Sequence, residues 1–189
     1  MPEFRDPQWK QPTPLGYGLA ADMFTSVAAP ILAGFSVAAI GVISADFEKF
    51  LWPGFSLLAL TAAVVLLVAS MQFGFHAKSL RYSPSDIHAW WSAEDLMEPG
   101  RKERICNDQH RDFEKSERWD VWARQTYNFG ICALALGVAA ALPPPEGASG
   151  AQAALRWAAA ALALFGVIAE LAWIAGDTRL GHWLARRLR

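Results

Sequence analysis

The stretch Leu51–Phe75, LWPGFSLLALTAAVVLLVASMQFGF, contains no charged side chain and decides the class of this chain. About 20 such residues cross a hydrocarbon core roughly 30 Å thick. Met23–Ala45 is also uncharged, and two further apolar segments cover Tyr127–Leu142 and Trp157–Gly176, the last interrupted by Glu170. These segments predict an all-α, polytopic membrane protein with four transmembrane helices.

The composition excludes several classes of protein. The 189 residues carry a net charge of −1, so no overall field favours nucleic acid as a partner. The two cysteines, Cys106 and Cys132, fall in a polar and an apolar segment, and we expect no disulfide between them. Residues 1–22 are polar and lack a signal-peptide pattern, so the first apolar segment is expected to stay as an anchor. An excess of Arg over Lys, with many Ala, Gly and Pro residues, indicates a bacterial protein.

The positions of Lys and Arg predict the orientation in the bacterial inner membrane, because positively charged loops stay in the cytoplasm. With both termini inside, only Lys49 and Arg156 lie on the outer side. The resulting division is a cytoplasmic N-terminal segment (1–22), transmembrane helices 1 and 2 (23–75), a cytoplasmic helical insert (76–125), transmembrane helices 3 and 4 (126–176) and a basic amphipathic C-terminal tail (177–189).

Small residues predict where the four helices pack, because helices in lipid associate through residues that let their backbones approach closely. Rows of such residues contain Gly34 and Gly41 on the first span, Gly130 and Gly137 on the third, and Gly166 on the fourth. The second span is bulkier and is expected to face more lipid. Pro30 is expected to disturb the first span, because proline lacks the amide hydrogen that a helix uses.

Polar residues inside the spans predict a layer near the cytoplasmic side. Glu170 lies in the row of small residues on the fourth span, and Gln72, His76 and Asn128 fall at a comparable depth on other spans. An acid at such a depth is costly and usually marks an ion or proton pathway. The alternatives are interhelical hydrogen bonds of about 0.6 kcal/mol each, or an acid that reaches the inner edge of the membrane.

The cytoplasmic insert is predicted to form two helices. Ser83 and Asp86 form a capping box for the first. The second is long and runs into the third span. It carries two pairs of opposite charges four residues apart, Glu114–Arg118 and Asp120–Arg124. Such pairs indicate an exposed helix, so this long helix is expected to be a solvated stalk, a docking platform or the helix of an oligomeric vestibule. A cytoplasmic protein partner would bind through residues 83–118.

Cys106 and His110, four residues apart, are weak candidates for metal binding or nucleophilic chemistry. A closed zinc site needs four ligands, and a Cys–His hydrolase needs a third group that orients the histidine. The sequence identifies neither, so we expect no cofactor and no enzymatic activity. Motifs of nucleic-acid binders are absent as well.

The sequence therefore favours a non-enzymatic inner-membrane protein. It would be an accessory or interaction subunit, or an oligomeric membrane effector, that receives a partner or signal through its cytoplasmic insert. The alternative hypothesis is an oligomeric ion- or proton-conducting channel or transporter that uses Glu170. The lipid bilayer, further copies of the chain and a cytoplasmic protein are its expected partners.

Overall fold

A computed structural model describes residues 9–10, 17–92, 94, 96 and 98–187, the last part (177–187) by its backbone alone. Every regular element in these residues is a helix, so the all-α prediction is confirmed. The elements are α1 (Tyr17–Met23), the π-helical η1 (Phe24–Ala28), α2 (Ala29–Ala45), the 3-10 turn η2 (Phe47–Lys49), α3 (Pro53–Ser79), α4 (Pro84–Trp90), α6 (Pro99–Ala141) and α7 (Ala151–Arg187). The amphipathic character predicted for the tail 177–189 lies outside the described side chains.

Three helical stretches are long and apolar enough to cross a membrane: Ala20–Ala45, Pro53–Ser79 and Ala151–Gly176. They coincide with the first, second and fourth apolar segments of the sequence, so the chain has the helices of a membrane protein. The third predicted span is the C-terminal part of α6, whose apolar stretch is shorter. At 1.5 Å per residue, the 43 residues of α6 extend over about 65 Å, roughly twice the thickness of a hydrocarbon core.

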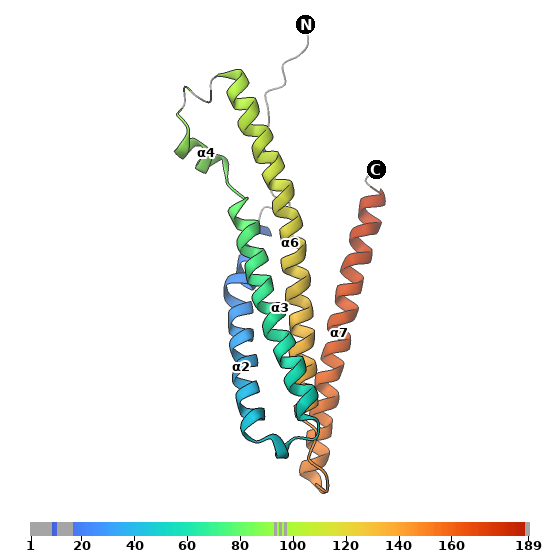
Figure 1. Cartoon of the computed structure of the whole chain (residues 1–189). Coiled ribbons are helices and arrows are strands. Elements are labelled where there is room, and N and C mark those ends of the chain that lie inside the picture. Colours follow the sequence, from blue (N-terminus) through green and yellow to red (C-terminus); the bar gives the residue numbers. More distant parts are fainter. Residues whose placement is uncertain (1–8, 11–16, 93, 95, 97, 188–189) are drawn as a thin grey trace.

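The long helices lie in a row, with α2 against α3, α3 against α6 and α6 against α7 (Figure 1). The turns 46–52 and 142–150 lie at one end of this row, which we call the loop end (Figure 1). The opposite end is the charged end. There the N-terminal part of α6 extends beyond α3, and α4 lies at the same level (Figure 1).

Local sequence signals explain where several helices begin. Prolines occupy the first turn of α3, α4 and α6, where a missing amide hydrogen costs little. The predicted capping box of α4 is present, since the Ser83 hydroxyl accepts from the Asp86 amide and the Asp86 carboxylate accepts from the Ser83 amide. The disturbance expected at Pro30 takes the form of the π-helical turn η1 just before it.

α3 and α6 pack along a seam with the alternating spacing of three and four residues that is typical of coiled coils. The buried residues of α3 are Ser56, Leu60, Ala63, Leu67, Ser70, Gly74 and Ala77. Buried residues of α6 with the same spacing are Cys106, Gln109, Phe113, Ser116, Asp120, Ala123, Gly130 and Gly137. The buried stripe of α6 thus continues past the end of α3, which the sequence analysis missed.

Two glycines of α6 bring the seam close together. A Cβ atom at Gly137 would lie 2.7 Å from Leu60 Cγ, and one at Gly130 would lie 2.9 Å from Leu67 Cγ. Both leucines are completely buried, and α3 has the largest buried share of the three candidate spans. The prediction that the bulky second span faces more lipid is therefore wrong, because its leucines fill the spaces that the glycines of α6 leave.

Two serine hydroxyls of α3 fasten the same seam. Ser56 Oγ donates to the Gly137 carbonyl at 2.6 Å, and Ser70 Oγ donates to the Ala123 carbonyl at 2.8 Å. Both serines are fully buried. Because water does not reach these buried positions, each bond gives the hydroxyl the hydrogen-bond partner that it would otherwise lack.

The remaining predicted packing glycines lie on helix faces that do not contact another helix. Nothing lies within 4 Å of a Cβ atom built at Gly34, Gly41 or Gly166. α2 is buried instead through Ala29, Ala33, Ser36 and Ile43. The packing contacts expected of these three glycines are therefore not made within one copy of the chain, because a different face of each helix meets its neighbours.

Candidate functional site

The charged end contains a layer of ion pairs, which we define as Asp22, Lys78, Arg81 and Asp120. Its most enclosed member is Asp120 on α6, which is 8% exposed and forms an ion pair with the Arg81 guanidinium. Arg81 also lies over the ring of Phe113, 5.6 Å from its centroid. Asp120 was expected to pair with Arg124 on an exposed face. It faces α3 instead, because it occupies a seam position of α6.

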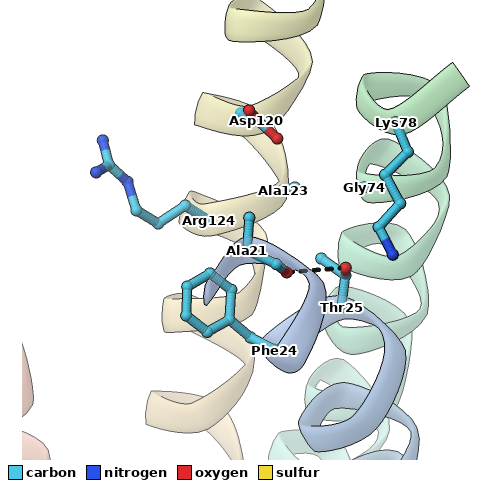
Figure 2. A pocket seen from close by; sticks show the side chains of 8 residues that line it. All are labelled: Ala21, Phe24, Thr25, Gly74, Lys78, Asp120, Ala123 and Arg124. Carbon is cyan, nitrogen blue, oxygen red and sulfur yellow. Dashed lines mark hydrogen bonds between the residues drawn. The ribbon is translucent and has the colours of Figure 1, made fainter. Parts of the chain in front are cut away.

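The second pair joins α1 to α3. Lys78 Nζ lies 2.9 Å from the Asp22 carboxylate and donates to Ser26 Oγ at 2.7 Å. Figure 2 shows Lys78 reaching down along α3 toward Thr25, while Asp120 lies on α6 above and Arg124 projects away. The layer therefore ties three parts of the chain together just where the apolar helices end.

Thr25 and Gly74 make a close contact beneath this layer that sequence reasoning did not identify. A Cβ atom at Gly74 would lie 2.6 Å from Thr25 Cγ2, and the Thr25 hydroxyl donates to the Ala21 carbonyl at 3.1 Å (Figure 2). A cavity of about 10 Å³ lies between these residues and Asp120. That is room for about one water molecule. The layer is thus a packed joint rather than a binding pocket.

The predicted polar layer of the spans is only partly assembled. Glu170 is half-buried on the side of α7 that faces Tyr127 and Cys132 of α6. Asn128 is half-buried on α6, whereas Gln72 and His76 are exposed on α3. No hydrogen bond joins these four predicted residues to one another in the part of the chain that the structure describes.

Cys106 and His110 are brought together, with Sγ and Nε2 3.8 Å apart. Cys106 is buried, and this burial raises the pKa of its thiol, against a smaller opposing effect of Lys102. A thiol of this kind is protonated at neutral pH and is a poor nucleophile or metal ligand. Among the described residues, no group of three or more His, Cys, Asp or Glu side chains is placed to hold a metal ion.

α4 presents one large aromatic side chain to the surroundings. Ile87 is 1% exposed, whereas Trp90, on the same short helix, is 71% exposed. The capping box holds the start of this helix, and the Ser83 hydroxyl and amide lower the pKa of the Asp86 carboxyl by donating hydrogen bonds to it. Trp90 is therefore an exposed apolar side chain on an ordered element.

Lys10, near the N-terminus, contacts the protruding half of α6. The buried side chain of Gln109 bonds both backbone groups of Lys10: its Oε1 accepts from the amide at 3.1 Å, and its Nε2 donates to the carbonyl at 3.0 Å. Lys10 Nζ lies 5.1 Å from the centroid of the Phe113 ring and 3.8 Å from the Glu114 carboxylate. Gln109 gave no signal in the sequence, because its role depends on a segment 99 residues away.

Two clusters of aromatic side chains mark the ends of the apolar region. At the loop end, the rings of Trp52 and Trp157 are 6.1 Å apart. Toward the charged end, the Phe73 ring lies 5.6 Å from Trp119 and 6.4 Å from Trp122. Along α3, the two clusters are about 30 Å apart at 1.5 Å per residue, which equals the thickness of a hydrocarbon core.

Comparison with known proteins gives no relative from which to transfer a role. No protein-family model matches this sequence, and no curated protein or solved structure shows significant similarity to the chain.

Proposed function

We propose that the chain is a multi-pass protein of the bacterial inner membrane whose four apolar segments all cross the bilayer. The support for a crossing by the third segment, the C-terminal part of α6, is the seam. The α6 residues Ala123, Gly130 and Gly137 lie against the middle of α3, which is itself long and apolar enough to span. If α3 crosses, the stretch of α6 beside it lies at the same depth. From Trp122 to the end of α6 is also about 30 Å of helix.

The orientation proposed has the charged end, and with it both termini, in the cytoplasm. Lys49 and Arg156 belong to the loop end, whereas Lys78, Arg81 and the cations of the protruding half of α6 belong to the charged end. This asymmetry is the one that retains positively charged segments inside. Aromatic residues at both boundaries fit the same placement, because their amphipathic rings favour the interface.

We propose further that the protein is a non-enzymatic interaction subunit that receives a cytoplasmic protein partner through residues 83–118. The observation that carries this proposal is Trp90, exposed on a capped helix beyond the end of the membrane-crossing part of α3. Tryptophan is enriched among the residues that dominate protein interfaces. The helix α6 then connects the receiving region to the membrane, since it is one helix from Pro99 to Ala141.

Affinity purification after mild crosslinking in the native host tests this function. The matched variants are Trp90→Ala and His88→Ala, which change exposed residues of the same helix. We expect one protein to be recovered with wild type and His88→Ala, and at least tenfold less of it with Trp90→Ala, because loss of such an anchor costs about 2 kcal/mol or more. Equal recovery with both variants would remove the interaction site from α4.

The second candidate function is an oligomeric ion or proton conductor, and Glu170 is the observation that favours it. Its carboxylate is half-buried between apolar helices and has no hydrogen-bond partner in the described part of the chain. Flux into proteoliposomes tests this function with wild type, Glu170→Gln and Glu170→Asp. Conduction requires flux that falls at least tenfold in Glu170→Gln and is partly retained in Glu170→Asp. Equal flux in all three proteins would exclude the carboxylate from any pathway.

A further inference from the structure

A second cavity, at the loop end, is larger than the one at the charged end and different in character. Its volume is about 410 Å³, within the range of sites that hold small molecules. We call it the loop-end cavity. It is lined by residues of several helices, among them Val42, Ile43, Leu60, Val138, Ala141 and Arg156. All of its lining side chains except that of Arg156 are apolar.

Arg156 on α7 is held in place at the edge of this cavity. Its Nε donates to the Leu142 carbonyl at 2.8 Å, and its Nη2 donates to the Pro143 carbonyl at 3.2 Å. A guanidinium has five N–H donors, so further donors remain available. Among the described residues, no acid lies within ion-pair distance of Arg156. The guanidinium therefore brings a positive charge to the edge of an apolar cavity.

The depth of Arg156 in the bilayer follows from its neighbour. Trp157 is the next residue, and its ring packs against Trp52 in the aromatic cluster of the loop end. Such clusters lie at the level of the lipid headgroups. The cavity, by contrast, extends to Leu60 and Gly137, about two turns of α3 further into the apolar region.

We propose that the loop-end cavity binds one acyl chain of a glycerophospholipid from the outer leaflet, with the phosphate of that lipid bound by Arg156. The apolar walls fit the acyl chain, and the guanidinium complements the negative phosphate at headgroup depth. This proposal rests on the membrane placement proposed above.

Native mass spectrometry of the purified full-length protein, after delipidation and controlled return of phosphatidylglycerol, tests the site. The filling variant is Ala141→Trp, which occupies the cavity, with Val42→Trp as a second filling variant from the opposite wall. The matched control is Ala62→Trp, which adds the same ring at an exposed position of α3 away from the cavity. Circular dichroism and gel filtration establish that each variant is folded.

We expect about one retained lipid per chain in wild type and in Ala62→Trp, and at least fivefold less in either folded filling variant. Arg156→Gln should retain at least threefold less phosphatidylglycerol, Arg156→Lys should restore part of the loss, and diacylglycerol should be insensitive to both changes. Retention that is equal in the filling variants and the control overturns the site. Retention unaffected by Arg156→Gln overturns the role of the guanidinium.

A wash of the membranes before purification separates failure of the site from failure of the membrane placement. A membrane protein stays with the membrane pellet after washing with sodium carbonate at high pH and enters solution only with detergent. If the chain is released without detergent, the membrane placement is wrong. If it requires detergent but shows no lipid retention that depends on the cavity, only the lipid site is wrong.

Discussion

The pairing of α3 with α6 and the pairing of α6 with α7 use helices of similar apolar character, yet they differ in how tightly they fit. In an apolar 18-residue stretch of each helix, 28% of α3, which lies between α2 and α6, is buried, compared with 11% of α7, which lies against α6 alone. The α3–α6 seam contains leucines seated on glycines, two buried serine hydrogen bonds and the Arg81–Asp120 ion pair. In α7, the only buried side chains among the described ones are those of Ala160 and Val167.

The comparison shows that apolar character alone does not hold these helices together. Lipid tails are as apolar as the side chains, so burial of leucine against another helix gains little, and close fit and hydrogen bonds decide. We therefore regard α3 and α6 as the frame of the protein, and α7 as the helix with the most surface left for lipid or another chain. The following substitutions test this difference. For each variant, the free energy of unfolding is measured by reversible unfolding in mixed micelles and compared with that of wild type.

The largest effect is expected from Asp120→Asn in the frame. Breaking a fully buried pair costs about 3–5 kcal/mol, and because the side chains of Asp120 and Arg81 are 9% and 18% exposed we expect about 2–3 kcal/mol. Asp108→Asn is the control on the same helix, since its pair with Arg111 is exposed on both sides. It should change the free energy of unfolding by less than about 0.5 kcal/mol. Equal costs would show that the seam does not enclose Asp120.

A methyl group added to a seam glycine should have the next largest effect. Gly137→Ala places a Cβ atom 2.7 Å from Leu60 Cγ, and overpacking of this kind costs about 1–3 kcal/mol. Gly166→Ala on α7 is the matched change, because nothing lies within 4 Å of its added atom. It should stabilise by about 0.5–1 kcal/mol, since alanine favours helices more than glycine does. A cost of the same size in both variants would contradict the difference between the two helix pairs.

Loss of a seam hydroxyl should be smaller. Ser70→Ala removes a hydrogen bond between helices, which is worth about 0.6 kcal/mol on average. Ser36→Ala is its control, because the Ser36 hydroxyl is also buried but donates to Leu32 of its own helix. Only the first change should lower the free energy of unfolding. If both or neither do, the α3–α6 hydroxyls are not what fastens the frame.

The smallest effect is expected from Glu170→Leu in α7. The carboxylate has no hydrogen-bond partner among the described residues, so its removal breaks no such bond. We expect a change within about 0.5 kcal/mol, or a slight stabilisation, because an acid in an apolar span is itself unfavourable. A loss above 1 kcal/mol would instead identify Glu170 as a structural link between α6 and α7.

The sequence was sufficient for the helices but not for their faces. Uncharged segments and the Ser83–Asp86 capping box carry local signals, and the structure has both. Which face of a span is buried is harder to predict, because a membrane helix is apolar all round. Gly34 and Gly41 stand in a row as regular as Gly130 and Gly137, yet only the latter pair meets another helix closely.

The ion-pair layer and the seam could be predicted only from a residue spacing that continues from the apolar segments into the polar ones. Ser56, Ser70 and Arg81 share one spacing along α3 and its end, but the first two lie in an apolar segment and the third in a polar one. Asp120 and Gly74 depend on contacts with segments far away in sequence. No local pattern encodes such pairings, and for this reason Asp120 was assigned to an exposed face.

The most direct test of the account is whether α6 crosses the membrane beside α3. In a chain with Cys106→Ser and Cys132→Ala, single cysteines at Ser149 of the loop end and at Asn107 of the charged end are treated with a membrane-impermeant maleimide on intact cells. Both positions are exposed. If α6 crosses beside α3, position 149 is labelled rapidly and position 107 is labelled only after the membrane is opened. Labelling of both positions from the same side would contradict this crossing.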